Sequence, residues 1–430
     1  MRFSAVLGLW VGLWVGLLLG VPAQTAMAAP LTLEAVLAEV DAPHPELRVS
    51  EARQALVRAE QQMTASLHDL RVSLDASLRG GHNATLGGYA PDHLARLQIK
   101  KTLVDAGQFV ALRGASENET AAAALLHADL RAQRRITLMA RFFDVLLADL
   151  AYAADSEFMA VAYVRWDNGK DLHQLGQIST PQWMELEARY QDLSLIRNAA
   201  ERRMREKRAL LATAMNRPGE LASEVSDPVL TANDRALPEF EKLLARMTAH
   251  NPQLAALRLQ LDAARQRVTS VRTSEGPRLE AEAEVGAYSR ETSGRDSVRA
   301  GINLIWPLSQ GRRWDGEMAR EQARLQQLQA EADLLALNLR QSLFDLGQEI
   351  SLLRDVERKT VLIQTSRSDW ALERARAEYE LELKSNLGVS MAETQTARLR
   401  SRSVEYRLAL AWARLDALLG EPMDHKEKKR

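Results

Sequence analysis

Residues 44–78 read HPELRVSEARQALVRAEQQMTASLHDLRVSLDASL, and residues 251–285 read NPQLAALRLQLDAARQRVTSVRTSEGPRLEAEAEV. The two stretches align without a gap, 207 positions apart, so that Pro45 matches Pro252 and Arg71 matches Arg278. Each begins with apolar residues at helical spacing and ends with alternating apolar and charged residues, which is typical of a half-buried strand. The sequence therefore predicts a duplicated unit that passes from helix to strand.

Each copy contains a second alternating segment after a polar stretch. Strands are expected at about 71–80 and 95–104, and again at about 278–288 and 296–306. The stretches between them, GGHNATLGGYAPD and SRETSGRD, are rich in Gly, Asn, Ser and charge and are expected to be loops. One face of the strands is apolar, with Val72, Leu74, Leu279, Ala281, Val298, Ile302 and Leu304. The other is polar, with Asp75, Glu280, Glu282, Glu284, Arg299 and Asn303.

Long segments without helix-breaking residues follow each strand pair. Residues 115–168 contain no Gly or Pro, and a continuous helix there would span roughly 80 Å. Residues 317–387 contain one Gly and no Pro, which predicts a helix of roughly 105 Å. The segments 182–216 and 389–419 are also free of both residues. Each copy is therefore expected to end in a long helical hairpin.

The N-terminus and the breaker-rich stretches divide the chain. Arg2, the apolar run from Phe3 to Val21 and the small-residue site Ala26-Met27-Ala28 predict a secretory signal peptide, the alternative being an uncleaved membrane anchor. The predicted divisions are the signal peptide (1–28), a first repeat (29–218), a linker (219–238), a second repeat (239–422) and a charged tail (423–430).

Strands with one apolar and one charged face need an apolar environment on one side and water on the other. A soluble core would supply both, and so would a membrane barrel with lipid outside and water inside. The four predicted strands come as two hairpins far apart in the sequence, and a lone hairpin is barely stable. Four strands cannot close a membrane barrel, which needs about eight. A barrel reading therefore predicts an oligomer, with eight strands from two chains or twelve from three.

Each second strand runs into a short turn, Leu103-Val104-Asp105-Ala106-Gly107 in one copy and Trp306-Pro307-Leu308-Ser309-Gln310-Gly311 in the other. These turns resemble those that end the barrel strands of TolC-like outer-membrane efflux proteins. The helix starts LTLEAV (31–36), HPEL (44–47) and NPQL (251–254) are similar to those of the same family. The resemblance covers about residues 31–422.

The resemblance implies a mainly α-helical protein with membrane β-structure, built from two tandem helix–strand–strand–helix repeats. Three chains would form a twelve-stranded β-barrel in the outer membrane of a Gram-negative bacterium, continued by a long periplasmic α-helical barrel. It also implies two protein partners, a periplasmic adaptor (membrane fusion) protein and an inner-membrane pump. The apolar strand face would then contact outer-membrane lipid and the polar face would line the lumen.

Family members carry a Gly-x-x-Ser/Thr turn at the periplasmic tips, where the adaptor binds. The first copy matches with Gly176 and Ser179, whereas the second has Ser385 but Glu382 in place of the glycine. Acidic residues that narrow the pore in some members correspond here to Gly388 and Met391, which are not acidic. The carboxylates of Asp167, Asp171 or Glu382 are alternative candidates for the tip lining.

The sequence offers no constellation for catalysis. The chain has 56 basic and 57 acidic residues, which gives no indication of nucleic-acid binding. It has no Cys, and none of its eight His forms a metal-binding pair with i,i+4 spacing. No phosphate-binding Gly loop or nucleophile elbow follows a strand. We therefore expect a protein that is not an enzyme and that has no cofactor and no metal.

Three functions remain open from the sequence. The first is a passive outer-membrane exit duct of a tripartite efflux pump for small toxic compounds such as drugs, metals or solvents. The second is an outer-membrane channel for type I protein secretion. The third is a soluble periplasmic coiled-coil adaptor or scaffold. On the barrel reading, Leu304→Arg would place a charge near mid-membrane and cost about 2–4 kcal/mol, whereas Asn303→Arg would be tolerated.

Overall fold

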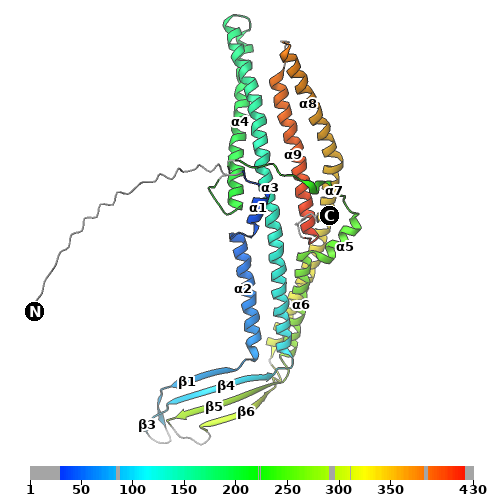
Figure 1. The fold of residues 1–430 in the computed structure, drawn as a ribbon. Helices are drawn as coiled ribbons and strands as arrows, with labels where there is room; N and C mark the ends of the chain where they lie inside the picture. The colour runs from blue at the N-terminus through cyan, green and yellow to red at the C-terminus, as the bar shows by residue number, and fades with distance from the viewer. Residues whose placement is uncertain are drawn as a thin grey trace, which may run out of the picture.

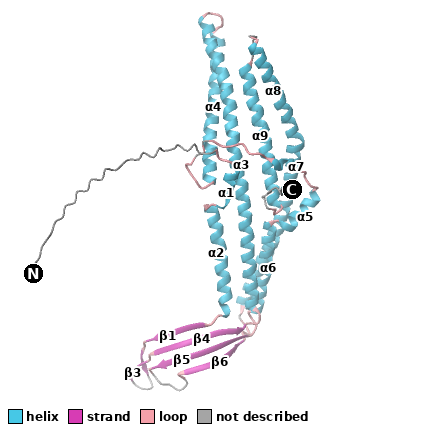
Figure 2. Cartoon of the chain, in the orientation of Figure 1, coloured by secondary structure: helices cyan, strands magenta, loops and turns pink. Residues whose placement is uncertain are grey.

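The structure is a computed structural model that describes residues 30–83, 88–220, 222, 224–289, 296–309, 311–381 and 386–421. It is elongated, with a β-sheet at one end and long helices running away from it (Figures 1 and 2). Two helical hairpins project from the opposite end, α3 with α4 and α8 with α9 (Figure 1). Among the described residues, no helix has the length and apolarity needed to cross a membrane.

The first half of the chain contains the following elements. They are α1 (Leu33–Ala38), η1 (Glu39–Asp41), α2 (Pro45–Ala65), η2 (Ser66–His68), β1 (Arg71–Ser77), β2 (Gly80–Asn83), β3 (Gly88–Pro91), β4 (Leu94–Val104), α3 (Gln108–Gln174) and α4 (Thr180–Ala214). The second half contains η3 (Thr231–Asp234), α5 (Phe240–His250), α6 (Pro252–Thr273), β5 (Arg278–Tyr288), β6 (Val298–Ile305), α7 (Arg312–Leu352), η4 (Leu353–Glu357), α8 (Arg358–Glu380) and α9 (Leu387–Leu418).

The two copies start their helices in the same way. His44 caps α2 by accepting a hydrogen bond at Nδ1 from the Glu46 amide at 3.3 Å. Asn251 caps α6 by accepting one at Oδ1 from the Leu254 amide at 3.0 Å. A proline follows each cap, which suits the first helical position because the missing N–H has no partner there in any case. The repeated HPEL and NPQL boxes are therefore helix-start signals.

The strands form one antiparallel sheet in the order β1-β4-β5-β6. The four expected strands are confirmed, but they are not separate hairpins, because β4 of the first copy pairs with β5 of the second. The stretch 80–92 was expected to be a loop throughout. This expectation is wrong in part, because β2 and β3 form a short two-stranded ribbon in which His82 pairs with Tyr89. Gly80, Gly81 and Gly88 lie within this ribbon.

The first long helix is α-helical throughout, whereas the second contains a π-helical turn. Helix α3 has 67 residues, which corresponds to roughly 100 Å. The expectation of one helix over 317–387 is confirmed as far as Glu380, where α8 ends, but the π-helical turn η4 lies between α7 and α8. Such a turn inserts an extra residue into the helix without requiring Gly or Pro. The amino-acid pattern therefore gave no sign of it.

The hydrophobic core lies midway along the molecule, where helices of both halves meet. One cluster joins α1, α3 and α9, with Phe143 stacked on Tyr406 at 4.5 Å between ring centroids. A second cluster joins α5, α7 and α9 around Leu343, Ile350 and Leu408, all fully buried. Helix α9 contributes to both clusters and therefore ties the two copies together.

Candidate functional site

The register of the sheet places its polar residues on one face. Directly opposed residues of antiparallel strands share a face. Three rows across the sheet are Ser73–Gln98–Glu284–Arg299, Arg71–Lys100–Glu282–Gly301 and Thr102–Glu280–Asn303. All six residues that the sequence assigned to the polar face lie on it, including Asp75, which is opposite Arg96. The structure thus assembles a continuous polar surface from both copies.

Charges on this polar face are largely balanced. Arg96 lies 3.0 Å from Asp75 and 3.6 Å from Glu284, and Lys100 lies 3.8 Å from Glu282. The Tyr288 hydroxyl also donates to Glu284 Oε1 at 2.9 Å. Because the carboxylates have cationic or donor neighbours, the face is polar without carrying a large charge of one sign.

The opposite face of the sheet is apolar and uncovered within the chain. Leu74, Val298, Ile302 and Leu304 are 65–71% exposed, and Val72 is 58% exposed. The outer edges of β1 and β6 pair with no strand in the described part of the chain. An exposed apolar face with two open edges is an unstable arrangement in water. A further surface must therefore cover it.

The first hairpin tip is a compact turn around Gly176. This residue has φ = +70°, in the left-handed region that favours glycine. Its amide donates to the His173 carbonyl at 2.9 Å, which closes the end of α3. Ser179 then caps α4 in a reciprocal arrangement with Gln182. The motif Gly-x-x-Ser thus supplies the residue that ends one helix and the residue that starts the next.

The second tip is only partly described. Glu382 and Ser385 lie outside the described residues. Gly388 lies in the first turn of α9, where a Cβ atom would come within 2.7 Å of Val161 Cγ2 on α3. The absence of a side chain at Gly388 lets the two hairpins approach closely near their tips. The carboxylates of Asp167 and Asp171 belong to exposed residues of the first hairpin.

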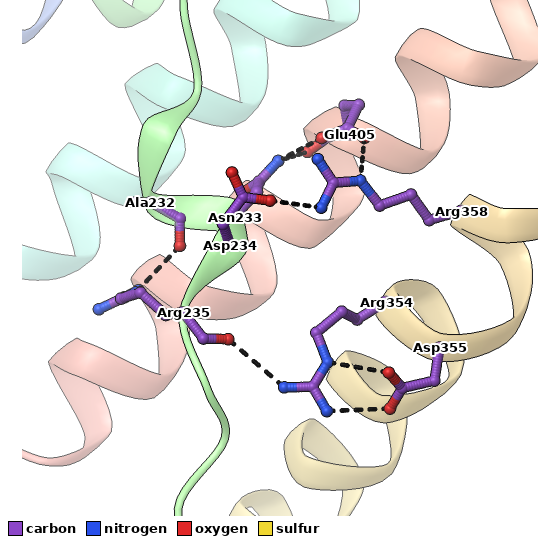
Figure 3. A network of polar contacts seen from close by, with 8 residues as sticks. All are labelled: Ala232, Asn233, Asp234, Arg235, Arg354, Asp355, Arg358 and Glu405. Carbon is purple, nitrogen blue, oxygen red and sulfur yellow. Dashed lines mark hydrogen bonds and ion pairs between the residues drawn. The ribbon is translucent and has the colours of Figure 1, made fainter. Parts of the chain in front are cut away.

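Residues 224–235, which we call the strap, connect the two halves at mid-height (Figure 1). The strap begins beside the N-terminal segment, where the Leu31 amide donates to the Glu224 carbonyl at 3.0 Å. Its far end contacts the second hairpin (Figure 3). There, Asn233 is fully buried and its Nδ2 donates to the Glu405 backbone and side chain at 3.0 and 2.7 Å.

Two arginines hold the end of the strap, Arg354 within the π-helical turn and Arg358 directly after it. Arg358 lies 2.7 Å from both Asp234 and Glu405, and Arg354 Nη1 donates to the Arg235 carbonyl at 3.4 Å (Figure 3). The π-helical turn therefore coincides with the point where the strap crosses α8 and α9.

Further contacts fix the strap to α9. The Arg235 guanidinium lies 3.1 Å from the Asp416 carboxylate and stacks on the Trp412 ring at 4.4 Å. The Tyr406 hydroxyl donates to Asp227 Oδ1 at 2.7 Å, and burial raises the pKa of this hydroxyl. Sequence reasoning treated this segment only as a linker. Its polar, proline-containing composition gave no sign that it is a structural tie between the repeats.

Nothing in the described ranges suggests catalysis or metal binding. No group of three or more His, Asp or Glu side chains is arranged to hold a metal ion there. Cavities in this part of the chain occur between helices and along the strap.

Comparison with known proteins agrees with these features. Residues 243–421 match the family model of the outer membrane efflux protein. The second half of the chain is therefore similar in sequence to the outer membrane efflux proteins. The matched family is one of outer-membrane channels and not of enzymes. No curated protein matches the sequence significantly.

Solved structures share the fold of this chain. VceC of Vibrio cholerae has 16% sequence identity and a TM-score of 0.72, with 90% of this chain and 96% of that chain covered. CmeC of Campylobacter jejuni has 13% identity and a TM-score of 0.73, with 90% and 85% covered. MtrE of Neisseria gonorrhoeae has 15% identity and a TM-score of 0.68, with 90% and 89% covered. Each is described as an outer membrane protein or channel.

Proposed function

We propose that three copies of this chain form a passive exit duct in the outer membrane. The observation that carries the proposal is the four-stranded sheet with one apolar face, one polar face and two unpaired edges. In lipid, every backbone N–H and C=O must be hydrogen-bonded, so an open sheet cannot persist there. Pairing β6 of one copy with β1 of the next removes every edge. Three copies would give twelve strands, and the greater circumference leaves a passage that eight strands would not.

The two faces then have distinct roles in the proposed barrel. Val72, Leu74, Leu279, Ala281, Val298, Ile302 and Leu304 would contact lipid. Asp75, Glu280, Glu282, Glu284, Arg299 and Asn303 would line the water-filled lumen. The alternation of apolar and polar rows in the register is the pattern that such a barrel requires.

The helices would continue the duct into the periplasm. Helix α3 is long enough, at roughly 100 Å, to extend well beyond the membrane. The adaptor would bind at the tips, with Gly176, Ser179, Glu382, Ser385 and Gly388 as the proposed contact residues. The left-handed turn at Gly176 gives the first tip a fixed shape for such a contact.

We infer that the duct works with a periplasmic adaptor and an inner-membrane pump, and that it exports small toxic compounds. The proposed mature chain begins after the signal peptide (1–28) and consists of the repeats 29–218 and 239–422. Transport through the duct itself would be passive.

Membrane fractionation, unheated gel electrophoresis and planar-bilayer recording together test the proposal. We expect the full chain in the outer-membrane fraction as a heat-dissociable trimer, with ion conductance after variants that loosen the tips. A soluble monomer would refute the duct. A membrane trimer that never conducts would refute the transport role while leaving the barrel intact.

A further inference from the structure

The apolar face of the sheet has one charged exception. Within the paired positions of β1, β4, β5 and β6, Lys101 is the only charged residue on that face. It is opposite Ala281, which is in turn opposite Ile302. Along its own strand, Ile99 and Val104 are the apolar-face neighbours on either side. A lysine in this position has to be explained if the face contacts lipid.

The preceding residue provides an internal comparison. Lys100 lies on the polar face, 3.8 Å from Glu282. Lys101 is exposed and makes no hydrogen bond or ion pair with any residue that the structure describes. The two lysines therefore differ in their surroundings although they are adjacent in the chain. An ammonium group without a protein partner in an apolar band needs a partner from outside the chain.

The position of Lys101 along the barrel wall identifies that partner. Strand β4 runs toward α3, and Lys101 lies three residues before its end. Trp306 follows β6 at the same end, continues the apolar-face series of Ile302 and Leu304, and is 59% exposed. Tryptophan concentrates at membrane–water interfaces, and a lysine slightly inside an apolar band extends its ammonium to the headgroups. Both residues thus mark one membrane boundary, on the side of the helices.

We propose that Lys101 binds the headgroup phosphate of an anionic phospholipid in the periplasmic leaflet, with Trp306 at the same interface. This inference rests on the proposed membrane barrel. The apolar neighbours Ile99 and Val104 suit acyl chains and not a free phosphate ion. A carboxylate of the next subunit is not the partner, because β4 is an internal strand and not an edge.

Lipid retention by the purified trimer tests this site. The full chain would be prepared in mixed phosphatidylglycerol and phosphatidylcholine, and retained lipids counted by native mass spectrometry. A single lysine near a membrane surface favours anionic lipid about fivefold. We therefore expect Lys101→Gln to lower the retained phosphatidylglycerol about fivefold per site, Lys101→Arg to preserve it, and the matched control Lys100→Gln to leave it unchanged. Equal retention by Lys101→Gln and the original chain, or loss in Lys100→Gln instead, would overturn the proposal.

A second measurement separates failure of the site from failure of the barrel. The difference in tryptophan fluorescence between the original chain and Trp306→Phe is the signal of Trp306 alone. In vesicles of brominated phospholipid, the quenching of this signal reports the depth of Trp306 in the membrane. We expect its quenching to be strongest with bromine near the headgroups. Strong quenching by bromine near the headgroups, together with unchanged phosphatidylglycerol retention in Lys101→Gln, would refute only the lipid site. No quenching and no vesicle insertion would refute the membrane barrel as well.

Discussion

An arginine scan across the sheet distinguishes its two faces at a known depth. Strand β5 has 11 residues, and its central residue, Ala283, is opposite Ala300. Ala300→Arg therefore introduces a charge at mid-height on the proposed lipid face. At the membrane midplane this costs about 2–4 kcal/mol per chain, which corresponds to roughly 30- to 1000-fold in an equilibrium constant.

The next residue supplies the matched control. Gly301 lies on the polar face opposite Glu282, and a Cβ atom there would meet nothing within 4 Å. Gly301→Arg adds the same charge one position away, into proposed lumen water and beside a carboxylate. We expect it to change stability by less than about 0.5 kcal/mol.

The structure also revises the expectation for Leu304. The sequence suggested a mid-membrane position, but β6 ends at Ile305, so Leu304 lies at the rim near the helices. The expected cost of Leu304→Arg falls to about 0–1 kcal/mol, because the penalty decreases toward the interface. Asn303→Arg, on the polar face of the same strand, should again be tolerated.

The assay is the amount and thermal midpoint of heat-dissociable trimer in outer-membrane fractions. We expect a strong loss for Ala300→Arg, a small one for Leu304→Arg, and none for the two polar-face variants. Similar losses for Ala300→Arg and Gly301→Arg would refute the face assignment. A greater loss for Leu304→Arg than for Ala300→Arg would refute the depth assignment.

Two further predictions concern the helical region. Arg235→Ala removes the guanidinium beside the nearly buried Asp416 carboxylate. It should lower the free energy of unfolding by about 3 kcal/mol, measured by thermal unfolding. An unchanged midpoint of unfolding would show that the strap does not stabilise the fold. Burial and the charge of Arg134 hold the pKa of His44 below its usual value. The neutral His44 side chain therefore contributes its full stabilisation above about pH 6.5, the ordinary pKa of histidine. This stabilisation is lost as the pH falls through the lowered pKa of the folded protein. His44→Asn keeps a capping oxygen and should weaken this acid sensitivity in unfolding curves between pH 7.5 and 5; an identical pH dependence in both proteins would contradict the assignment.

Much of the architecture followed from local patterns. The period-two alternation at 71–79 and 279–287 predicted strands that the structure contains. The absence of Gly and Pro over 115–168 predicted a continuous helix that is in fact longer. These features depend on neighbouring residues only, because steric and hydrophobic periodicity act over a few positions.

Other features depend on contacts between distant parts of the chain. The pairing of β4 with β5 joins residues almost 190 positions apart, for example Leu97 with Val285. The strap is held by Arg358 and Glu405, which lie far along the sequence from Asn233. The π-helical turn lies at that crossing, in a segment that has no Pro and whose one Gly, Gly347, lies outside the turn. No local pattern encodes such contacts.

The sequence by itself determined the duplicated helix–strand–strand–helix plan and which strand residues share a face, because both follow from backbone geometry and side-chain alternation. Only the tertiary structure decided that the four strands make a single sheet with open edges and that the linker binds α8 and α9. The physical reason is that register and buried ion pairs are set by long-range packing, which the order of residues does not display.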